Sequence, residues 1–227
     1  MKYIFSTTTN YGNKSVVGFD FFATFDNVFA LCDGANSCHN SGILAEKLSR
    51  KIVKNWASSC LDKKLRKNYL SAEIIQIHKE LLLDNLDAAS TLVALGVFDD
   101  FFEMISVGDS YGEVFEKVGK KKWEHFSSMP RDIDSNNNPF QLIGSEVLKK
   151  IHYQFFPQKK TWCIFMMSDG LGNFVDSGDL LERLSLLGDE LPNKNDLDFI
   201  ANDLAKSAFI RGSKDDISIT VIFLYSK

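Results

Sequence analysis

The sequence predicts an α+β domain in which antiparallel sheets are covered by helices. Three observations support this fold class: short apolar β-type stretches come in consecutive blocks, amphipathic helices come in pairs between the blocks, and no internal repeat or low-complexity linker interrupts them. A chain of 227 residues suits one compact domain with a substantial core. We therefore expect residues 1–227 to form a single domain.

The first half of the chain alternates strand patterns with helix patterns. Three strands are expected in YIFSTTT, DFFATF and NVFALCD, which are separated by turn-rich residues. Apolar residues then recur at helical spacing over 41–56, and a second amphipathic helix is predicted over 71–86 with Ser71 as its cap. A meander of strands is predicted at 90–98, 102–108 and 112–119. The first of these is apolar on both faces and is therefore expected to be central.

The second half contains fewer strand patterns. Between residues 120 and 158 the periodicity is weak, and RDIDSNNNP at 131–139 is predicted to be a mobile surface loop. The remaining predicted elements are a buried strand at 162–168, helices at 179–187 and 196–210, a helix stop at Gly212, and a last apolar strand at 217–225.

Composition and charge exclude several classes of protein. With 44% apolar and 25% charged residues, the chain is an ordinary globular protein. A formal net charge of -4 provides no basic field for nucleic acid or for an anionic membrane. Four scattered cysteines do not make a disulfide scaffold, and the first residues lack a cleavable signal. We expect a cytoplasmic monomer, although export without a cleavable signal would leave the same sequence pattern.

Four apolar strands each carry an aspartate at one end or in the adjoining turn. The segments are FALCDG with Asp33, ISVGDS with Asp109, FMMSDG with Asp169 and GSKDDISIT with Asp215. Each motif alone is common turn chemistry. Together, however, strand ends fix the backbones of carboxylates that must converge on one ion, and hard cations such as Mg²⁺ and Mn²⁺ take oxygen ligands.

The order of these motifs resembles that of the protein phosphatase 2C family, the metal-dependent Ser/Thr protein phosphatases. The correspondence runs from about Gly12 to the C-terminus, and the length is similar to that of short bacterial members. The resemblance implies a four-layer sandwich, with two antiparallel β-sheets packed face to face and flanked by helices. It also implies hydrolysis of phosphoprotein monoesters by a water or hydroxide that bridges two Mg²⁺ or Mn²⁺ ions.

The resemblance also implies roles for individual residues. Asp33 matches the aspartate that bridges both metals, and the carbonyl of Gly34 would ligate one of them. Asp169 and Asp215 match the other two direct ligands.

Two further aspartates match outer positions in the family's site. Asp20 is similar to the aspartate that holds metal-bound waters, and Asp109 to the aspartate of a third, weaker metal site. Asn173 stands where that third site has an aspartate, which weakens it. Lys14 stands in, with one residue of extra spacing, for the arginine that grips the substrate phosphate. Ala35 replaces a histidine that protonates the leaving group in some members.

Other functions compete with this interpretation. The altered first motif favours a catalytically silent, phosphatase-like binding or regulatory module. Cys60 and Arg66 have the Cys-x5-Arg spacing of cysteine-dependent phosphatases, but the intervening LDKKL lacks the small residues that a phosphate loop needs. Cys32, Cys38 and His39 lack a fourth ligand at the spacing of a structural zinc site.

Overall fold

The computed structural model describes residues 2–10, 19–58, 63–84, 86–157 and 160–225. Its strands are β1 (Lys2–Asn10), β2 (Asp20–Phe25), β3 (Val28–Asp33), β4 (Leu92–Val97), β5 (Phe101–Val107), β6 (Tyr111–Gly119), β7 (Lys122–Ser128), β8 (His152–Pro157), β9 (Trp162–Met167) and β10 (Ile217–Tyr225). Its helices are α1 (Ser41–Ser58), α2 (Lys63–Leu83), α3 (Asp169–Gly172), α4 (Ser177–Ser185) and α5 (Lys194–Ile210).

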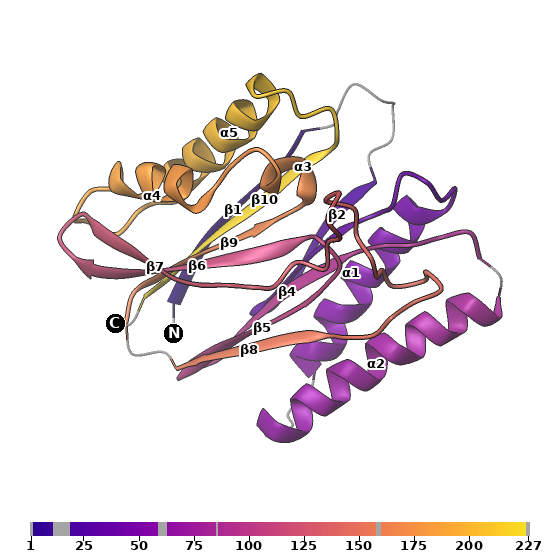
Figure 1. Cartoon of the computed structure of the whole chain (residues 1–227). Helices are drawn as coiled ribbons and strands as arrows, with labels where there is room; N and C mark the ends of the chain where they lie inside the picture. The colour runs from indigo at the N-terminus through magenta and orange to yellow at the C-terminus, as the bar shows by residue number, and fades with distance from the viewer. Residues whose placement is uncertain (1, 11–18, 59–62, 85, 158–159, 226–227) are drawn as a thin grey trace.

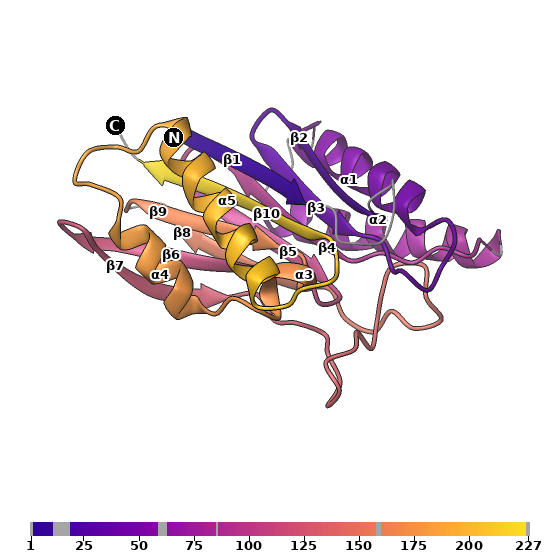
Figure 2. The same cartoon turned by 90° about the horizontal axis from the view of Figure 1, so that it is seen from above.

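The strands form two five-stranded antiparallel sheets. One sheet has the order β1-β10-β9-β6-β7, and the other has the order β2-β3-β4-β5-β8. Helices α1 and α2 cover the outer face of the second sheet, and α3, α4 and α5 lie on the outer face of the first (Figures 1 and 2). The predicted four-layer α+β sandwich is therefore confirmed.

Strand β3 shows how the second sheet is buried on both faces. Because side chains alternate along a strand, Phe29 and Leu31 enter the core between the sheets, whereas Val28 and Ala30 pack in the core under α1 and α2. Continuing this alternation, Asp33 belongs to the face between the sheets, at the end of the strand. The apolar run of β3 thus delivers a carboxylate to one end of the sandwich.

Two predictions for the middle of the chain are wrong. Helix α2 begins at Lys63, so Ser71 lies inside the helix and does not cap it. The predicted meander is also interrupted: β4 and β5 pair with each other, but β6 joins the other sheet beside β9. The chain crosses between the sheets directly after β5. Gly108, with a φ of +88°, permits this sharp turn.

Two strands that the sequence does not predict, β7 and β8, lie between residues 120 and 158, where the apolar periodicity is weak. Each lies at the edge of its sheet, and β7 buries only Trp123, so neither gives a clear alternation of apolar and polar residues. The predicted surface loop at 131–139 is exposed only from residue 134 onward, because Asp132 is buried. The other predicted elements agree with the structure to within a few residues, and Gly212 follows α5 with a φ of +103°.

Candidate active site

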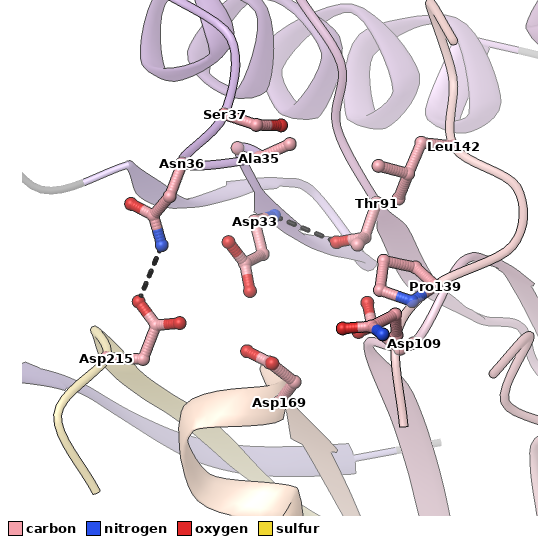
Figure 3. Close-up of a pocket in the computed structure, with 12 residues that line it drawn as sticks. Asp33, Ala35, Asn36, Ser37, Thr91, Asp109, Pro139, Leu142, Asp169 and Asp215 are labelled. Carbon is pink, nitrogen blue, oxygen red and sulfur yellow. Dashed lines mark hydrogen bonds between the residues drawn. The ribbon is translucent and has the colours of Figure 1, made fainter. Parts of the chain in front are cut away.

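A cavity of about 440 Å³ lies where several loops meet at one end of the sandwich. Four aspartates line it: Asp33, Asp109, Asp169 and Asp215. The carboxylates of Asp33, Asp169 and Asp215 point into the same space, and Asp109 lies at its side (Figure 3). Gly34 also borders the cavity. The structure thus brings together five of the six predicted metal-site residues, and the sixth, Asp20, lies behind Asp33.

Asp33 is held through its backbone by the neighbouring strand. Its N–H donates to the hydroxyl of Thr91 at 3.0 Å, and its carbonyl accepts from the N–H of Thr91 at 2.8 Å. The next residue, Gly34, must be glycine, because a Cβ there would lie 2.7 Å from the carbonyl carbon and oxygen of Ser41 in the first turn of α1. The close approach of α1 therefore fixes the direction of the chain as it leaves Asp33.

Asp20 is a buried carboxylate without adequate partners. It lies opposite Asp33 in the β2–β3 pair and is 5% exposed. No described residue makes a hydrogen bond of normal geometry to either of its carboxylate oxygens. Burial raises the pKa of Asp20 to about 7, and the negative charge of Asp216 also raises it. The nearby hydroxyl of Ser218 lowers the pKa, but only partly offsets this increase. Such a group needs a proton, water or a cation.

The turn between β5 and β6 places Asp109 at the side of the cavity. Behind it, the N–H of Gly108 donates to the buried carboxylate of Asp132 at 3.0 Å, and the N–H of Asp132 donates to the carbonyl of Gly108 at 2.8 Å. Gln141 and His152 contact the same carboxylate at 2.6 and 2.7 Å. This network clamps the turn from the protein interior.

Asp169 and Asp215 reach the cavity from two loops in direct contact. Asp169 begins α3, and a Cβ on the following Gly170 would lie 1.9 Å from the backbone oxygen of Asp216. The side-chain amide of Asn36 donates to Asp215 at 2.9 Å, which orients that carboxylate (Figure 3). The first loop after β3 and the loop before β10 are thereby tied together across the cavity.

The electrostatics of the cavity favour a bound cation. Burial raises the pKa of Asp33 well above its usual range, and the charges of Asp20 and Asp169 add to this effect. Burial likewise raises the pKa of Asp109 to about 7, with Asp169 contributing, and raises the pKa of Asp169, with Asp215 contributing. Each carboxylate resists ionisation beside its neighbours unless positive charge is supplied.

No group of three or more histidine, cysteine or acidic side chains in the described part of the chain could hold a metal ion as it stands. This is compatible with Mg²⁺ or Mn²⁺, because Mg²⁺ keeps several waters and is commonly bound through only one or two carboxylates. The oxygen-only donor set, the crowded carboxylates and the unsatisfied Asp20 fit such ions. They do not fit zinc, which prefers nitrogen and sulfur ligands.

Several residues of the site carried no recognisable sequence signal. Asp132 and Arg131 lie in a segment whose polar composition predicts a loop. Their contacts with the β5–β6 turn, and those of Arg131 with the end of α3, connect them to the cavity. Thr91 was predicted only as part of a strand. By contrast, Lys14 and Cys60 lie outside the described residues, so the structure does not place them.

Comparisons with known proteins identify the fold. No protein-family model matches the chain, and a search of curated proteins finds no significant match. Among solved structures, the serine/threonine phosphatase of S. agalactiae aligns with a TM-score of 0.80 at 18% identity, covering 99% of this chain and 100% of that one. Stp1 from Staphylococcus aureus aligns with a TM-score of 0.79 at 16% identity, covering 100% and 96%. The Mycobacterium tuberculosis phosphatase PstP/Ppp aligns with a TM-score of 0.73 at 16% identity, covering 99% of each chain.

The chain has the fold of the bacterial serine/threonine phosphatases. The resemblance inferred from the order of the motifs is thus confirmed for the fold. At these identities the likeness does not extend to the chemistry, which rests on the residues of the cavity. Within this phosphatase fold, the cavity lies at the strand ends that carry Asp33, Asp109 and Asp169. No helix among the described residues is long and apolar enough to cross a membrane.

The raised pKa values predict how the metal-free phosphatase fold responds to pH. In EDTA, Asp109 has a pKa of about 7 in the folded state against about 3.9 in an unfolded chain. The folded state then binds more protons, so this group's contribution to stability is complete below about pH 4 and is lost as pH rises towards 7. The melting temperature of Asp109→Asn relative to the wild type should therefore be higher by several degrees at pH 8 than at pH 5.

Thermal unfolding followed by circular dichroism at both pH values, in EDTA, measures this difference. The same substitution at Asp100, in the exposed β4–β5 turn, is the control and should not change the pH dependence. An Asp109→Asn protein that is less stable than the wild type by the same amount at pH 5 and pH 8 would contradict the proposed crowding of charge.

Proposed function

We propose that the chain is a metal-dependent phosphatase that hydrolyses phosphate monoesters, with serine- or threonine-phosphorylated proteins as its substrates. The phosphatase fold supports the reaction class, and residues 1–227 would form one catalytic domain. The observation that carries the metal dependence is the lining of the cavity. Four aspartates line it, and no lysine, arginine or histidine is among its described lining residues.

This lining cannot by itself accept a phosphate ester. A phosphate dianion would meet four carboxylates and no cationic side chain among the described lining residues, and Coulomb repulsion in a partly enclosed site is strong. Two divalent cations balance the charge of four ionised carboxylates. Asp33, Asp169 and Asp215, together with the carbonyl of Gly34, are the groups that would hold them, and Asp20 would act from behind Asp33 through water.

When bound, two Mg²⁺ or Mn²⁺ ions would activate water and neutralise charge on the phosphoryl oxygens. The chain contributes by positioning. Asn36 fixes the orientation of Asp215, and Thr91 fixes the backbone of Asp33. Because the acidic groups are held by strand ends and tight loop contacts, little reorganisation is needed when a substrate enters.

The cysteines bear on the location of the protein. Of the four cysteines, the three described ones, Cys32, Cys38 and Cys163, are free, which supports a reducing and therefore cytoplasmic location. We propose a monomer that acts on proteins rather than on nucleic acid. The alternative of a catalytically silent module is not favoured, because a binding module has no need to hold four carboxylates around one cavity.

Removing one carboxylate tests the proposal. Asp169→Asn should lower kcat for an aryl phosphate by about 100-fold or more, the order seen when a group that stabilises transition-state charge is lost. The control, Asp100→Asn, makes the same chemical change in an exposed turn and should leave kcat unchanged. Steady-state kinetics with Mn²⁺, and again with EDTA, provide the measurement. Hydrolysis that survives EDTA but is abolished by thiol alkylation would instead support the Cys60 hypothesis.

Lys14 remains our proposal for the cation that meets the substrate phosphate. It is the only lysine or arginine between Asn10 and Asp20, and its ammonium offers a point charge rather than a bidentate fork. Lys14→Ala should mainly raise KM with a smaller effect on kcat, because such a contact serves the ground state and the transition state alike. If KM and kcat are both unchanged, the metals or another cation hold the phosphate.

A further inference from the structure

Arg131 connects two of the acidic loops, although it does not line the cavity. Its Nε donates to the carbonyl of Asp109 at 3.2 Å, which belongs to the β5–β6 turn. Its two terminal nitrogens donate to the carbonyl of Gly172 at 3.4 Å and to the side-chain oxygen of Asn173 at 2.7 Å, both at the end of α3. One guanidinium therefore holds the Asp109 turn against the short helix that begins with Asp169.

An aromatic ring fixes the orientation of this guanidinium. Its central carbon lies 4.9 Å from the centre of the Tyr111 ring, within the range of a cation–π contact. Tyr111 is itself buried against α3, since a Cβ on Gly172 would come within 2.4 Å of the ring. Tyr111 therefore holds the guanidinium of Arg131 beside the end of α3.

The charge of Arg131 acts on the two carboxylates that it connects. Burial raises the pKa of both Asp109 and Asp169, and Arg131 opposes the increase at both. An arginine keeps its positive charge at any pH at which the protein is folded. The oxygen of Asn173, which could otherwise face a cation between these loops, already accepts a hydrogen bond from Arg131.

We propose that Arg131 is a positioning residue whose guanidinium serves as the fixed cation on the Asp109 side of the cavity. It holds Asp109 in register with Asp169 and takes the place of a third metal ion there. This inference rests on the proposed function, because it assumes that two divalent ions bind elsewhere in the cavity. It also explains why residue 173 can be an asparagine. A metal ion at this place would need the negative charge of an aspartate, whereas Arg131 needs only a hydrogen-bond acceptor, which the side-chain oxygen of Asn173 provides.

Counting bound Mn²⁺ by equilibrium dialysis of the full chain tests the inference without relying on activity. The wild type and Asn173→Asp should each bind two ions per chain, because Arg131 still occupies the third position. Arg131→Gln combined with Asn173→Asp should bind three. Arg131→Lys combined with Asn173→Asp keeps the charge and should remain at two. Arg50→Gln, which removes a positive charge from an exposed ion pair on α1, is the control and should bind two.

Kinetics separate a positioning role from a purely structural one. Arg131→Gln should lower kcat about 10–100-fold, the usual cost of losing an outer partner of a metal site, with KM changed less than about twofold. Arg131→Lys should recover only part of kcat, because one ammonium cannot replace three directed hydrogen bonds. A variant that lowers kcat no more than Arg50→Gln would overturn the positioning role.

The outcomes distinguish the two proposals. If the wild type binds no Mn²⁺, the proposed function fails and this inference fails with it. If the wild type binds two ions and the Gln–Asp double variant also binds only two, the proposed function stands and the inference is wrong. Three ions in Asn173→Asp alone would also overturn it. Because this outcome needs no Arg131 variant, the inference can be overturned even if the Arg131 variants do not fold, which circular dichroism would reveal.

Discussion

Repulsion among carboxylates at one end of the sandwich is the constraint on which the rest of this site depends. Asp33, Asp109, Asp169 and Asp215 line one cavity, and Asp20 lies buried behind them. Burial and mutual repulsion raise the pKa of several of these groups, so bringing them together lowers the stability of the metal-free protein near neutral pH. The fold compensates through backbone contacts that do not depend on the charges, and a bound cation would recover the remaining cost.

Those backbone contacts depend on two glycines and on one buried polar network. Gly34 allows α1 to approach the end of β3, and Gly170 allows α3 to touch the loop before β10. The buried carboxylate of Asp132 fixes the turn after β5, together with Gln141 and His152. In each case the contact is made to the backbone of a loop that carries a cavity aspartate. The carboxylate of that aspartate is therefore free to face the cavity.

The sequence predicted the strongly apolar parts of the fold and the acidic residues that follow them. Strands such as β9 and β10 are buried along nearly their whole length, so their pattern is clear, and the aspartates that follow β3 and β9 could be found from it. The edge strands β7 and β8 were missed because few of their side chains are buried. The crossing from β5 to β6 was also missed, since a strand pattern does not say which sheet a strand joins.

The contacts of Arg131 could not be found from the sequence for a different reason. Its acceptors belong to Asp109, Gly172 and Asn173, which are 22 to 42 residues away along the chain. Such a contact depends on the packing of the β5–β6 turn against α3, and no local pattern records it. The same holds for Asn36 and Asp215, which are 179 residues apart and meet only across the cavity.

The central claim is that these carboxylates are gathered to hold divalent ions. The most direct test is a crystal structure determined with Mn²⁺, using anomalous diffraction at the manganese absorption edge to locate the ions. We expect two anomalous peaks inside the cavity, among Asp33, Asp169 and Asp215. The absence of any peak in the cavity, at Mn²⁺ concentrations that support hydrolysis, would contradict it.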